Sequence, residues 1–156
     1  MQVDVKAYWE QVKQFSQYPE DQRALGYVLG LMAEAGEVCG VVDKWLRGKY
    51  DEDDMERRLL DELGDVCWYA AACMSVQLWV GEGDDWIDDL VVFRRRPLGE
   101  VLSALVAAAA DKALWDVLDE VATLAAWSGS SIQAVLDANV AKLRARHAPD
   151  ANHDNL

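Results

Sequence analysis

The chain has 156 residues, 28 of them acidic and 15 basic, so its formal net charge is −13. This length fits one domain with its own core, and a hydrophobic share of 52% excludes a disordered acidic chain. The negative net charge excludes a basic surface that binds a nucleic-acid polymer. The chain contains no run of about 18 apolar, uncharged residues, so no membrane span is predicted. Because the N-terminus also lacks a signal-peptide pattern, we expect a cytoplasmic protein whose three cysteines stay reduced.

Helical periodicity dominates the chain and the alternation typical of strands is missing, which predicts an all-α protein. The first expected helix covers about residues 4–17 and ends before Pro19. The second covers about residues 21–47, and Gly48 follows it in the position of a helix-ending glycine. The third covers about residues 54–80, after an acidic turn that is expected to cap it.

An irregular, strongly charged stretch over 84–97 separates these helices from the second half of the chain, and we expect it to form solvated loops and turns. A further helix is expected over about 98–127, either continuous or broken near Asp111. The last expected helix covers 132–146, with Ser131 or the serine before it as the N-cap.

Two pairs of carboxylates provide the strongest functional signal. Glu34 and Glu37 lie in the middle of the second expected helix, and Glu62 and Asp65 lie in the middle of the third. The i, i+3 spacing places both members of a pair on one helix face, at the border of an apolar stripe. Because a short turn joins the two helices, antiparallel packing is expected to bring the four carboxylates together.

Four carboxylates in one partly buried pocket repel one another, and burial disfavours their charged forms. A divalent cation makes such a site tolerable, and ligands that are all oxygen atoms favour Mg²⁺ or Mn²⁺. A di-iron site of the helical-bundle type uses histidine ligands, but His147 and His153 lie at the C-terminal end, far from both pairs. We therefore predict Mg²⁺ as the cofactor, with Mn²⁺ as the alternative.

Glycines and two further side chains accompany the acidic pairs. A glycine in a helix interior costs about 1 kcal/mol relative to alanine, so those in these helices are expected to permit close approach of a neighbouring helix or ligand. They are Gly30, Gly36, Gly40 and Gly64. Lys44 follows Glu37 by seven residues and Tyr69 follows Asp65 by four, so both extend the acidic faces. A cation beside a metal–carboxylate cluster suits a phosphate chain that also contacts the metal.

Together these features resemble the MazG-like, all-α nucleoside triphosphate pyrophosphohydrolase superfamily. Its pattern of ExxE, a spacer and ExxD is matched by Glu34, Glu37, Glu62 and Asp65. The strings EAGEV and DELGDV, the latter with Trp68 and Tyr69 shortly after it, are close to those typical of the family. The string LRG with Tyr50 after it is similar to small phage and bacterial members. The last expected helix resembles the C-terminal signature N-x-x-K-L-x-x-R, at Asn139, Lys142 and Arg146.

The resemblance covers about residues 22–80 and 114–147 and implies an antiparallel helical bundle. Residues 81–113 depart from the compact family pattern and are expected to be an insertion. On this basis residues 1–147 form a single MazG-like domain, and residues 148–156 form a flexible C-terminal tail.

The resemblance also implies an activity, which is the Mg²⁺-dependent hydrolysis of a nucleoside or deoxynucleoside triphosphate to the monophosphate and pyrophosphate. The four carboxylates would hold the metal, with Glu37 also acting as the base for the attacking water. Phosphate contacts are expected from Lys44, Asn139, Lys142 and Arg146. A nucleobase offers a flat face for stacking, and the expected stacking partners are Trp9, Trp45 and Tyr69.

The sequence also leads to expectations about the assembly of the protein and about alternative functions. The family assembles as dimers or tetramers, and the Ala-rich helix over 101–127 is consistent with subunit packing, so a homodimer or homotetramer is expected. A non-catalytic helical module that senses nucleotides or binds a partner is the alternative function, suggested by the acidic run at 84–89 and the expected insertion. A third option is a related phosphoanhydride substrate, such as a phosphoribosyl-ATP or an alarmone.

Overall fold

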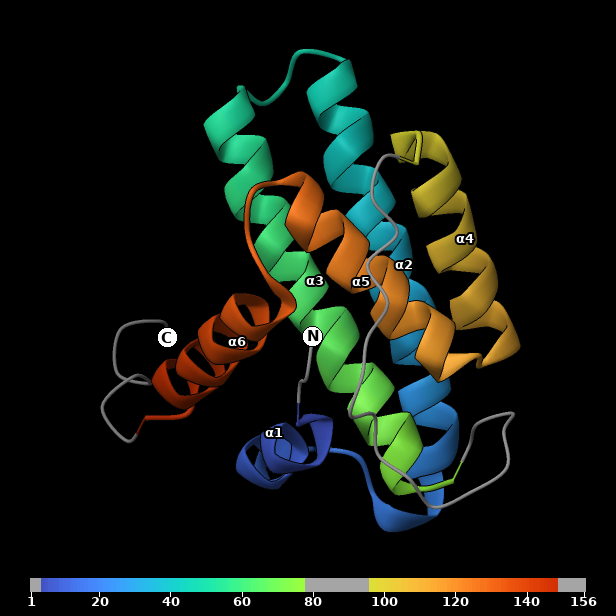
Figure 1. The fold of residues 1–156 in the computed structure, drawn as a ribbon. Coiled ribbons are helices and arrows are strands. Elements are labelled where there is room, and N and C mark those ends of the chain that lie inside the picture. Colours follow the sequence, from blue (N-terminus) through green and yellow to red (C-terminus); the bar gives the residue numbers. More distant parts are fainter. Residues whose placement is uncertain (1–3, 78–95, 149–156) are drawn as a thin grey trace.

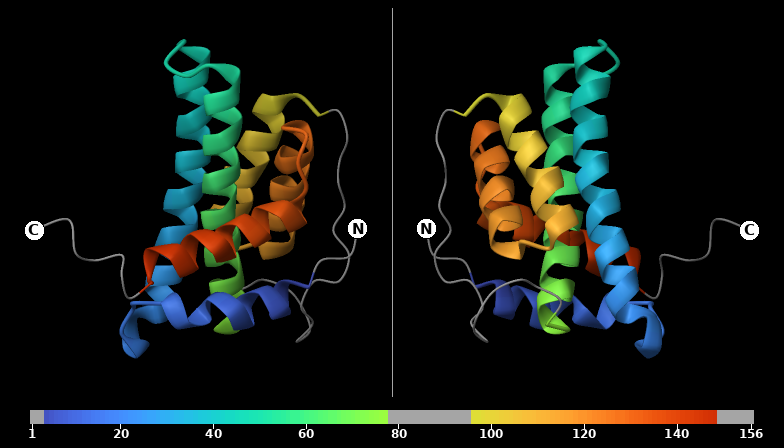
Figure 2. Two further views of the ribbon diagram at one scale, coloured as in Figure 1. Left: turned by 90° about the vertical axis from the view of Figure 1, so that its left-hand side faces the viewer. Right: turned by 90° about the vertical axis from the view of Figure 1, so that its right-hand side faces the viewer.

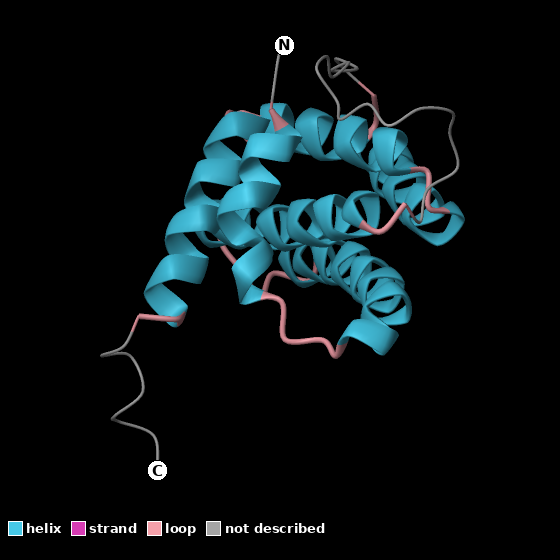
Figure 3. Ribbon diagram, turned by 90° about the horizontal axis from the view of Figure 1, so that it is seen from below, coloured by secondary structure: helices cyan, strands magenta, loops and turns pink. Residues whose placement is uncertain are grey.

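The structure is a computed structural model that describes residues 4–77 and 96–148. Within these ranges every regular element is helical (Figure 3). The elements are α1 (Val5–Val12), the 3₁₀ turns η1 (Lys13–Phe15) and η2 (Glu20–Gln22), α2 (Arg23–Leu46), α3 (Glu52–Ser75), α4 (Leu98–Asp111), α5 (Leu114–Trp127) and α6 (Ile132–Arg146). The expected all-α class is therefore confirmed for this part of the chain. The expected acidic piece at 84–89 and nearly all of the tail, 149–156, lie outside the described residues.

The two longest helices, α2 and α3, form an antiparallel hairpin that runs the length of the molecule (Figure 1). A second and shorter hairpin, α4 and α5, lies along it, with α4 packed against α2 and α5 against both α3 and α6. Helix α6 crosses α3, and α1 lies across the end of the long hairpin, where it contacts α3 and α6 (Figure 2). The predicted antiparallel packing of the two carboxylate-bearing helices is present.

Helix α3 lies at the centre of the core because its apolar residues face several neighbours at once. Leu59, Leu63, Val66 and Cys73 are all fully or almost fully buried, and so are most residues of α5. In α4, Val101 and Leu105 are buried in the same cluster. The described part of the expected 81–113 insertion, from residue 98 onward, therefore belongs to the bundle itself and is not an appendage, since its apolar side chains complete the core.

Local sequence signals account for several helix ends. The carboxylate of Asp51 accepts the backbone N–H of Asp54, and the hydroxyl of Ser131 accepts that of Ala134, so both act as the N-caps of their helices. Gly48 has φ of +70°, which suits the residue that follows a helix. Of the two alternatives for 98–127, the helix broken near Asp111 is confirmed, because Lys112 adopts a left-handed conformation with φ of 57° and ends α4.

The first helix is shorter than predicted. It ends at Val12, and a 3₁₀ turn over Lys13–Phe15 continues the chain in place of the α-helix expected to residue 17. Val12 itself is fully buried, and the carbonyl of Val12 accepts the indole N–H of Trp68 at 3.4 Å. This tertiary contact lies at the residue where α1 ends, and helical periodicity alone does not contain it.

Arg96 departs from the expectation of a solvated loop before α4. Its guanidinium donates to Oε1 of Glu120 on α5 at 2.5 Å, and the Glu120 side chain is buried. A buried carboxylate needs such a partner because charge is costly to remove from water. The ion pair therefore fixes the start of α4 to α5.

One stretch, Glu20–Leu46, is long and apolar enough to pass for a membrane span by length and composition. Only 39% of its most apolar window is buried in the fold, and the helix carries Glu34 and Glu37 in its middle. The faces of α2 that do pack inside the bundle explain part of this apolar character, since the core helix of a folded protein passes the same test.

Candidate metal centre and adjoining cavity

Three of the four predicted carboxylates meet at the seam between α2 and α3. One oxygen each from Glu34, Glu62 and Asp65 lies within 4.8 Å of the others, and all three residues are half-buried. We call these residues the carboxylate triad. They converge because buried neighbours in the same helices, Ala35 and Leu63 among them, fix which faces of α2 and α3 meet.

Glu37, the fourth predicted member, does not join the triad. It is exposed one turn beyond Glu34 on α2. Its charge nevertheless contributes to raising the pKa of both Glu34 and Glu62, so it lies close enough to act on them. The structure thus groups three of the four expected ligands, and Glu37 as a fourth ligand stays a prediction.

The ionised form is disfavoured for two of the triad carboxylates, Glu34 and Glu62. Burial, followed by the charges of Asp65, Glu62 and Glu37, raises the pKa of Glu34 from 4.5 to about 7. Burial and neighbouring carboxylates likewise raise the pKa of Glu62 above its usual value. Among the described residues, no side-chain hydrogen bond or ion pair is formed by Glu34 or Glu62. A hard divalent cation is the group that such an arrangement of oxygens suits.

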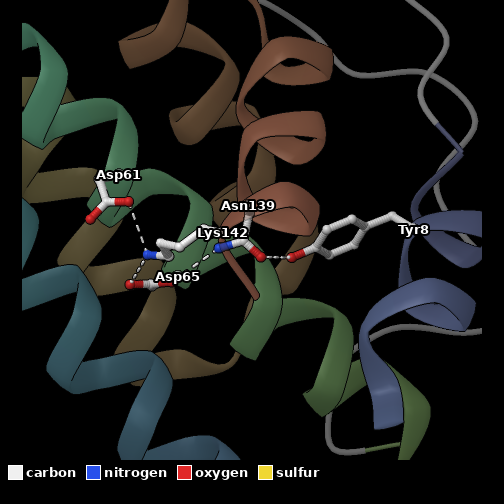
Figure 4. Close-up of polar contacts among 5 residues, drawn as sticks. All are labelled: Tyr8, Asp61, Asp65, Asn139 and Lys142. Carbon is white, nitrogen blue, oxygen red and sulfur yellow. Dashed lines mark hydrogen bonds and ion pairs between the residues drawn. The ribbon is translucent and has the colours of Figure 1, made fainter. Parts of the chain in front are cut away.

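Asp65 differs from the other two because α6 supplies it with donors. The amide Nδ2 of Asn139 donates to Oδ1 of Asp65 at 3.0 Å, and Nζ of Lys142 donates to Oδ2 at 2.7 Å (Figure 4). Lys142 also pairs with Asp61 at 3.0 Å. Burial lowers the pKa of Lys142, but its bonds to Asp65 and Asp61 outweigh burial and leave that pKa raised. Lys142 therefore remains charged.

A cavity of about 570 Å³ opens beside the triad. Its acidic lining residues are Glu34 and Asp65, and Arg146 adds a cation. The remaining lining is mainly aromatic, and we call the whole space the aromatic cavity. Its other lining residues are Phe15, Gln17, Tyr18, Trp68, Tyr69, Leu143 and His147.

Two glycines of α2 seat the tyrosines of the aromatic cavity. A Cβ atom at Gly30 would lie 2.0 Å from the ring of Tyr69, and one at Gly26 would lie 2.4 Å from the ring of Tyr18. The two tyrosine hydroxyls are 3.1 Å apart and share a hydrogen bond. Gly30 thus permits the close approach predicted for it, and so does Gly64 toward α6, whereas Gly36 and Gly40 have nothing within 4 Å.

Sequence reasoning missed several residues that line this cavity, among them Phe15, Tyr18 and His147. Phe15 and His147 stack with ring centroids 4.9 Å apart, and Tyr18 hydrogen-bonds to Tyr69. Phe15 and Tyr18 lie in the link between α1 and α2, which carries no motif, and His147 follows α6 directly. The expectation that His147 lies far from the acidic pairs holds along the sequence but is wrong in space, since it lines the same cavity as Glu34 and Asp65.

Lys44 and Trp45 are not brought to the triad. They lie ten and eleven residues after Glu34 on the same helix, which corresponds to roughly 15 Å along its axis. There the Lys44 ammonium is 6.0 Å from the ring centroid of Tyr50, and Trp45 contacts Trp127 edge to face at 6.3 Å. Both predicted substrate contacts therefore lie in the last turn of α2, whereas Glu34 lies in the middle of that helix.

The other predicted substrate contacts divide into three groups. Tyr69 and Arg146 line the aromatic cavity. Trp9 is buried in the core, where its ring contacts Tyr27 and Trp68 edge to face. Asn139 and Lys142, both predicted to contact phosphate, are bonded to Asp65 instead and so orient a triad member. Asn139 is buried, and Lys142 is half-buried.

Removing the charge of Glu34 is expected to stabilise the metal-free protein at alkaline pH. Because the folded-state pKa is raised, the folded chain holds a proton that the unfolded chain has lost, and stability falls as pH rises from 4.5 through about 7. Glu34→Gln should therefore raise the melting temperature at pH 8 by roughly 2–4 °C, about 1 kcal/mol after discounting for solvent screening.

Thermal denaturation in a chelator at several pH values checks this expectation. The melting temperatures of the wild-type protein and Glu34→Gln should converge as pH approaches 4.5, where the wild-type carboxyl is also neutral. A difference that does not change with pH would contradict the stated cause.

Comparisons with protein-family models, curated proteins and solved structures found no match to this chain.

Proposed function

We propose that the chain is a Mg²⁺-dependent nucleoside triphosphate pyrophosphohydrolase of the MazG-like type. The observation that supports this best is that the carboxylate triad adjoins the aromatic cavity, since Glu34 and Asp65 belong to both. A nucleoside triphosphate needs oxygen ligands for the hard cation on its phosphates and, beside them, an aromatic surface on which its base can stack.

The triad residues fit the proposed metal by their chemistry. Three half-buried carboxylates with oxygens within 4.8 Å of one another offer hard ligands, and two of them, Glu34 and Glu62, form no ion pair within the described residues. Bound there, Mg²⁺ would neutralise charge on phosphate oxygens and lower the pKa of a water molecule. Mn²⁺, with the same preference for oxygen, is the natural substitute and a useful probe.

Glu37 is the proposed general base, because it lies next to the triad without belonging to it. Its carboxylate would take one proton from the attacking water. The water oxygen then bonds to phosphorus while the bond between the α- and β-phosphates breaks, which yields a nucleoside monophosphate and pyrophosphate. The proton held by Glu37 afterwards returns to solvent, to which that side chain is exposed.

The aromatic cavity is the proposed site for the nucleobase. Its volume of about 570 Å³ lies within the usual range for small-molecule sites, roughly 300–1,000 Å³. Tyr69 and the stacked pair of Phe15 and His147 offer aromatic faces and edges for a flat ring. Arg146 lines the same space with an exposed guanidinium, which suits a phosphate contact.

A panel of nucleotides tests the proposed function. Ribo- and deoxyribonucleoside triphosphates, canonical and modified, are incubated with the protein and Mg²⁺, and pyrophosphate is measured. Release with at least one of them, abolished by a chelator, is the expected result. Mass analysis of products separates this reaction from cleavage of a phosphoribosyl-ATP or an alarmone, and tight nucleotide binding without any hydrolysis would favour the non-catalytic alternative.

At least a homodimer is expected, through the outer face of α2. Leu25, Leu29 and Met32 are 65%, 56% and 46% exposed and recur at i, i+4 and i+7, so they form one apolar stripe. Leu29→Glu should convert the assembly to monomers in light scattering, because burying a carboxylate in an apolar contact is costly. Leu46→Glu is the matched control, since Leu46 is also exposed but lies at the end of the helix. A monomeric wild-type protein would contradict the expectation.

A further inference from the structure

Tyr8 stands at the start of a polar chain that reaches the carboxylate triad from α1. Its hydroxyl donates to Oδ1 of Asn139 at 2.7 Å, and Nδ2 of Asn139 donates to Oδ1 of Asp65 at 3.0 Å (Figure 4). Tyr8 and Asn139 are each only 3% exposed. Water therefore has little access to replace either partner, and three helices are joined through two hydrogen bonds.

The Tyr8 hydroxyl determines which end of the Asn139 amide faces Asp65. An amide has one acceptor end and one donor end, and a carboxylate only accepts. With the acceptor end engaged by Tyr8, the NH₂ group is directed at Asp65. Burial raises the pKa of Tyr8 well above its ordinary value, so the hydroxyl keeps the proton that it donates. The opposite orientation would point the amide oxygen at a carboxylate oxygen, which is repulsive.

Gly64 provides the space in which this arrangement fits. A Cβ atom at Gly64 would lie 2.9 Å from Nδ2 and 3.0 Å from Cβ of Asn139, both of which belong to the side chain. Gly64 immediately precedes Asp65, so the Asn139 side chain packs directly on the backbone next to the triad member that it contacts. The close contact and the hydrogen bonds together hold the amide in one place.

Lys142 holds the other oxygen of the same carboxylate at 2.7 Å. It is a flexible point charge that Asp61 shares, so it neutralises charge without setting one orientation. The directional constraint on Asp65 therefore comes from Asn139, and that on Asn139 comes from Tyr8.

We propose that Tyr8 is a positioning residue for metal binding, acting through Asn139 to hold the Asp65 carboxylate in the orientation in which it ligates a divalent cation with Glu34 and Glu62. This inference rests on the proposed function, because it requires a cation at the triad. Outer partners that orient ligands typically change metal affinity by about 10–100-fold when removed. Tyr8 acts one bond further out, so we expect about a tenfold effect.

The experiment measures Mn²⁺ affinity by the loss of its free-ion electron paramagnetic resonance signal, with no nucleotide present. Tyr8→Phe keeps the ring and removes only the hydroxyl. Tyr27→Phe is the matched control, because Tyr27 is equally buried and its hydroxyl bonds to Ser16 at 2.8 Å, away from the triad. We expect about tenfold weaker binding for Tyr8→Phe and unchanged binding for Tyr27→Phe.

A double-mutant cycle tests the route through Asn139. Asn139→Ala should weaken Mn²⁺ binding by about 10–100-fold, and adding Tyr8→Phe should cause no further loss if the hydroxyl acts only through the amide. Additive losses, wild-type affinity for Tyr8→Phe, or equal weakening by Tyr27→Phe would each overturn the inference while leaving the proposed function in place. A wild-type protein that binds no Mn²⁺ would overturn both.

Discussion

Glu62→Gln and Asp65→Asn are expected to abolish Mg²⁺-dependent hydrolysis, with kcat/KM reduced more than about 100-fold in each variant. The basis for this size is that outer-shell partners alone change metal affinity by about 10–100-fold, and these residues are the proposed ligands themselves. Both replacements keep the shape of the side chain and remove its charge. Pyrophosphate release and Mn²⁺ titration measure the two effects on the same samples.

The same variants should remain folded, which separates loss of function from loss of structure. Burial and nearby carboxylates raise the pKa of Glu62, so neutralising it relieves repulsion in the metal-free protein. The wild-type melting temperature should rise by roughly 5–10 °C when Mg²⁺ reaches about 100 times its dissociation constant, and that gain should be lost in Glu62→Gln.

Glu56→Gln is the matched control for this experiment. Glu56 lies on the same helix six residues before Glu62, or roughly 9 Å along the axis, and is not a member of the triad. Its neutralisation should change neither turnover nor the Mg²⁺-dependent gain in melting temperature. Full activity in both Glu62→Gln and Asp65→Asn would show that the triad does not hold the catalytic metal.

Glu37→Gln is expected to lower kcat by about 10²–10⁴-fold while Mn²⁺ affinity stays within about twofold of wild type. The physical reason is its position, since Glu37 is exposed next to the triad and outside it, which leaves its carboxylate available to accept a proton. Kinetics at saturating nucleotide and Mg²⁺, together with metal titration, separate the role of a base from that of a ligand.

Asp43→Asn serves as the control for Glu37→Gln. Asp43 is also an exposed acid of α2, and it forms only a surface ion pair with Arg47 at 2.5 Å. A parallel loss of Mn²⁺ affinity and kcat in Glu37→Gln would make Glu37 a fourth ligand. An unchanged kcat would show that another group, or the metal-bound water alone, accounts for the proton transfer.

Local patterns predicted the helices well where a helix end depends on a few neighbouring residues. The caps at Asp51 and Ser131 and the glycine at position 48 are examples, because each end is completed within three residues of the cap. The end of α1 depends instead on a buried contact between Val12 and Trp68, more than fifty residues apart, which periodicity does not contain.

The candidate site could likewise be predicted from the sequence only in part. The i, i+3 pairs on adjacent helices were enough to predict that Glu34, Glu62 and Asp65 meet, because a short turn leaves few ways to pack two amphipathic helices. The spacing could not show that Glu37 faces solvent. That distinction depends on the rotation of α2 against α3, which side chains of the whole core determine.

The sequence by itself determined the helical class and the helices that carry the acidic pairs, because periodicity and caps are local properties of the chain. Only the tertiary structure decided that Phe15, Tyr18 and His147 line one cavity with the triad, and that Tyr8 reaches Asp65 through Asn139. These contacts join residues from opposite ends of the chain. They arise from how α1 and α6 pack across α3, and no single segment encodes that packing.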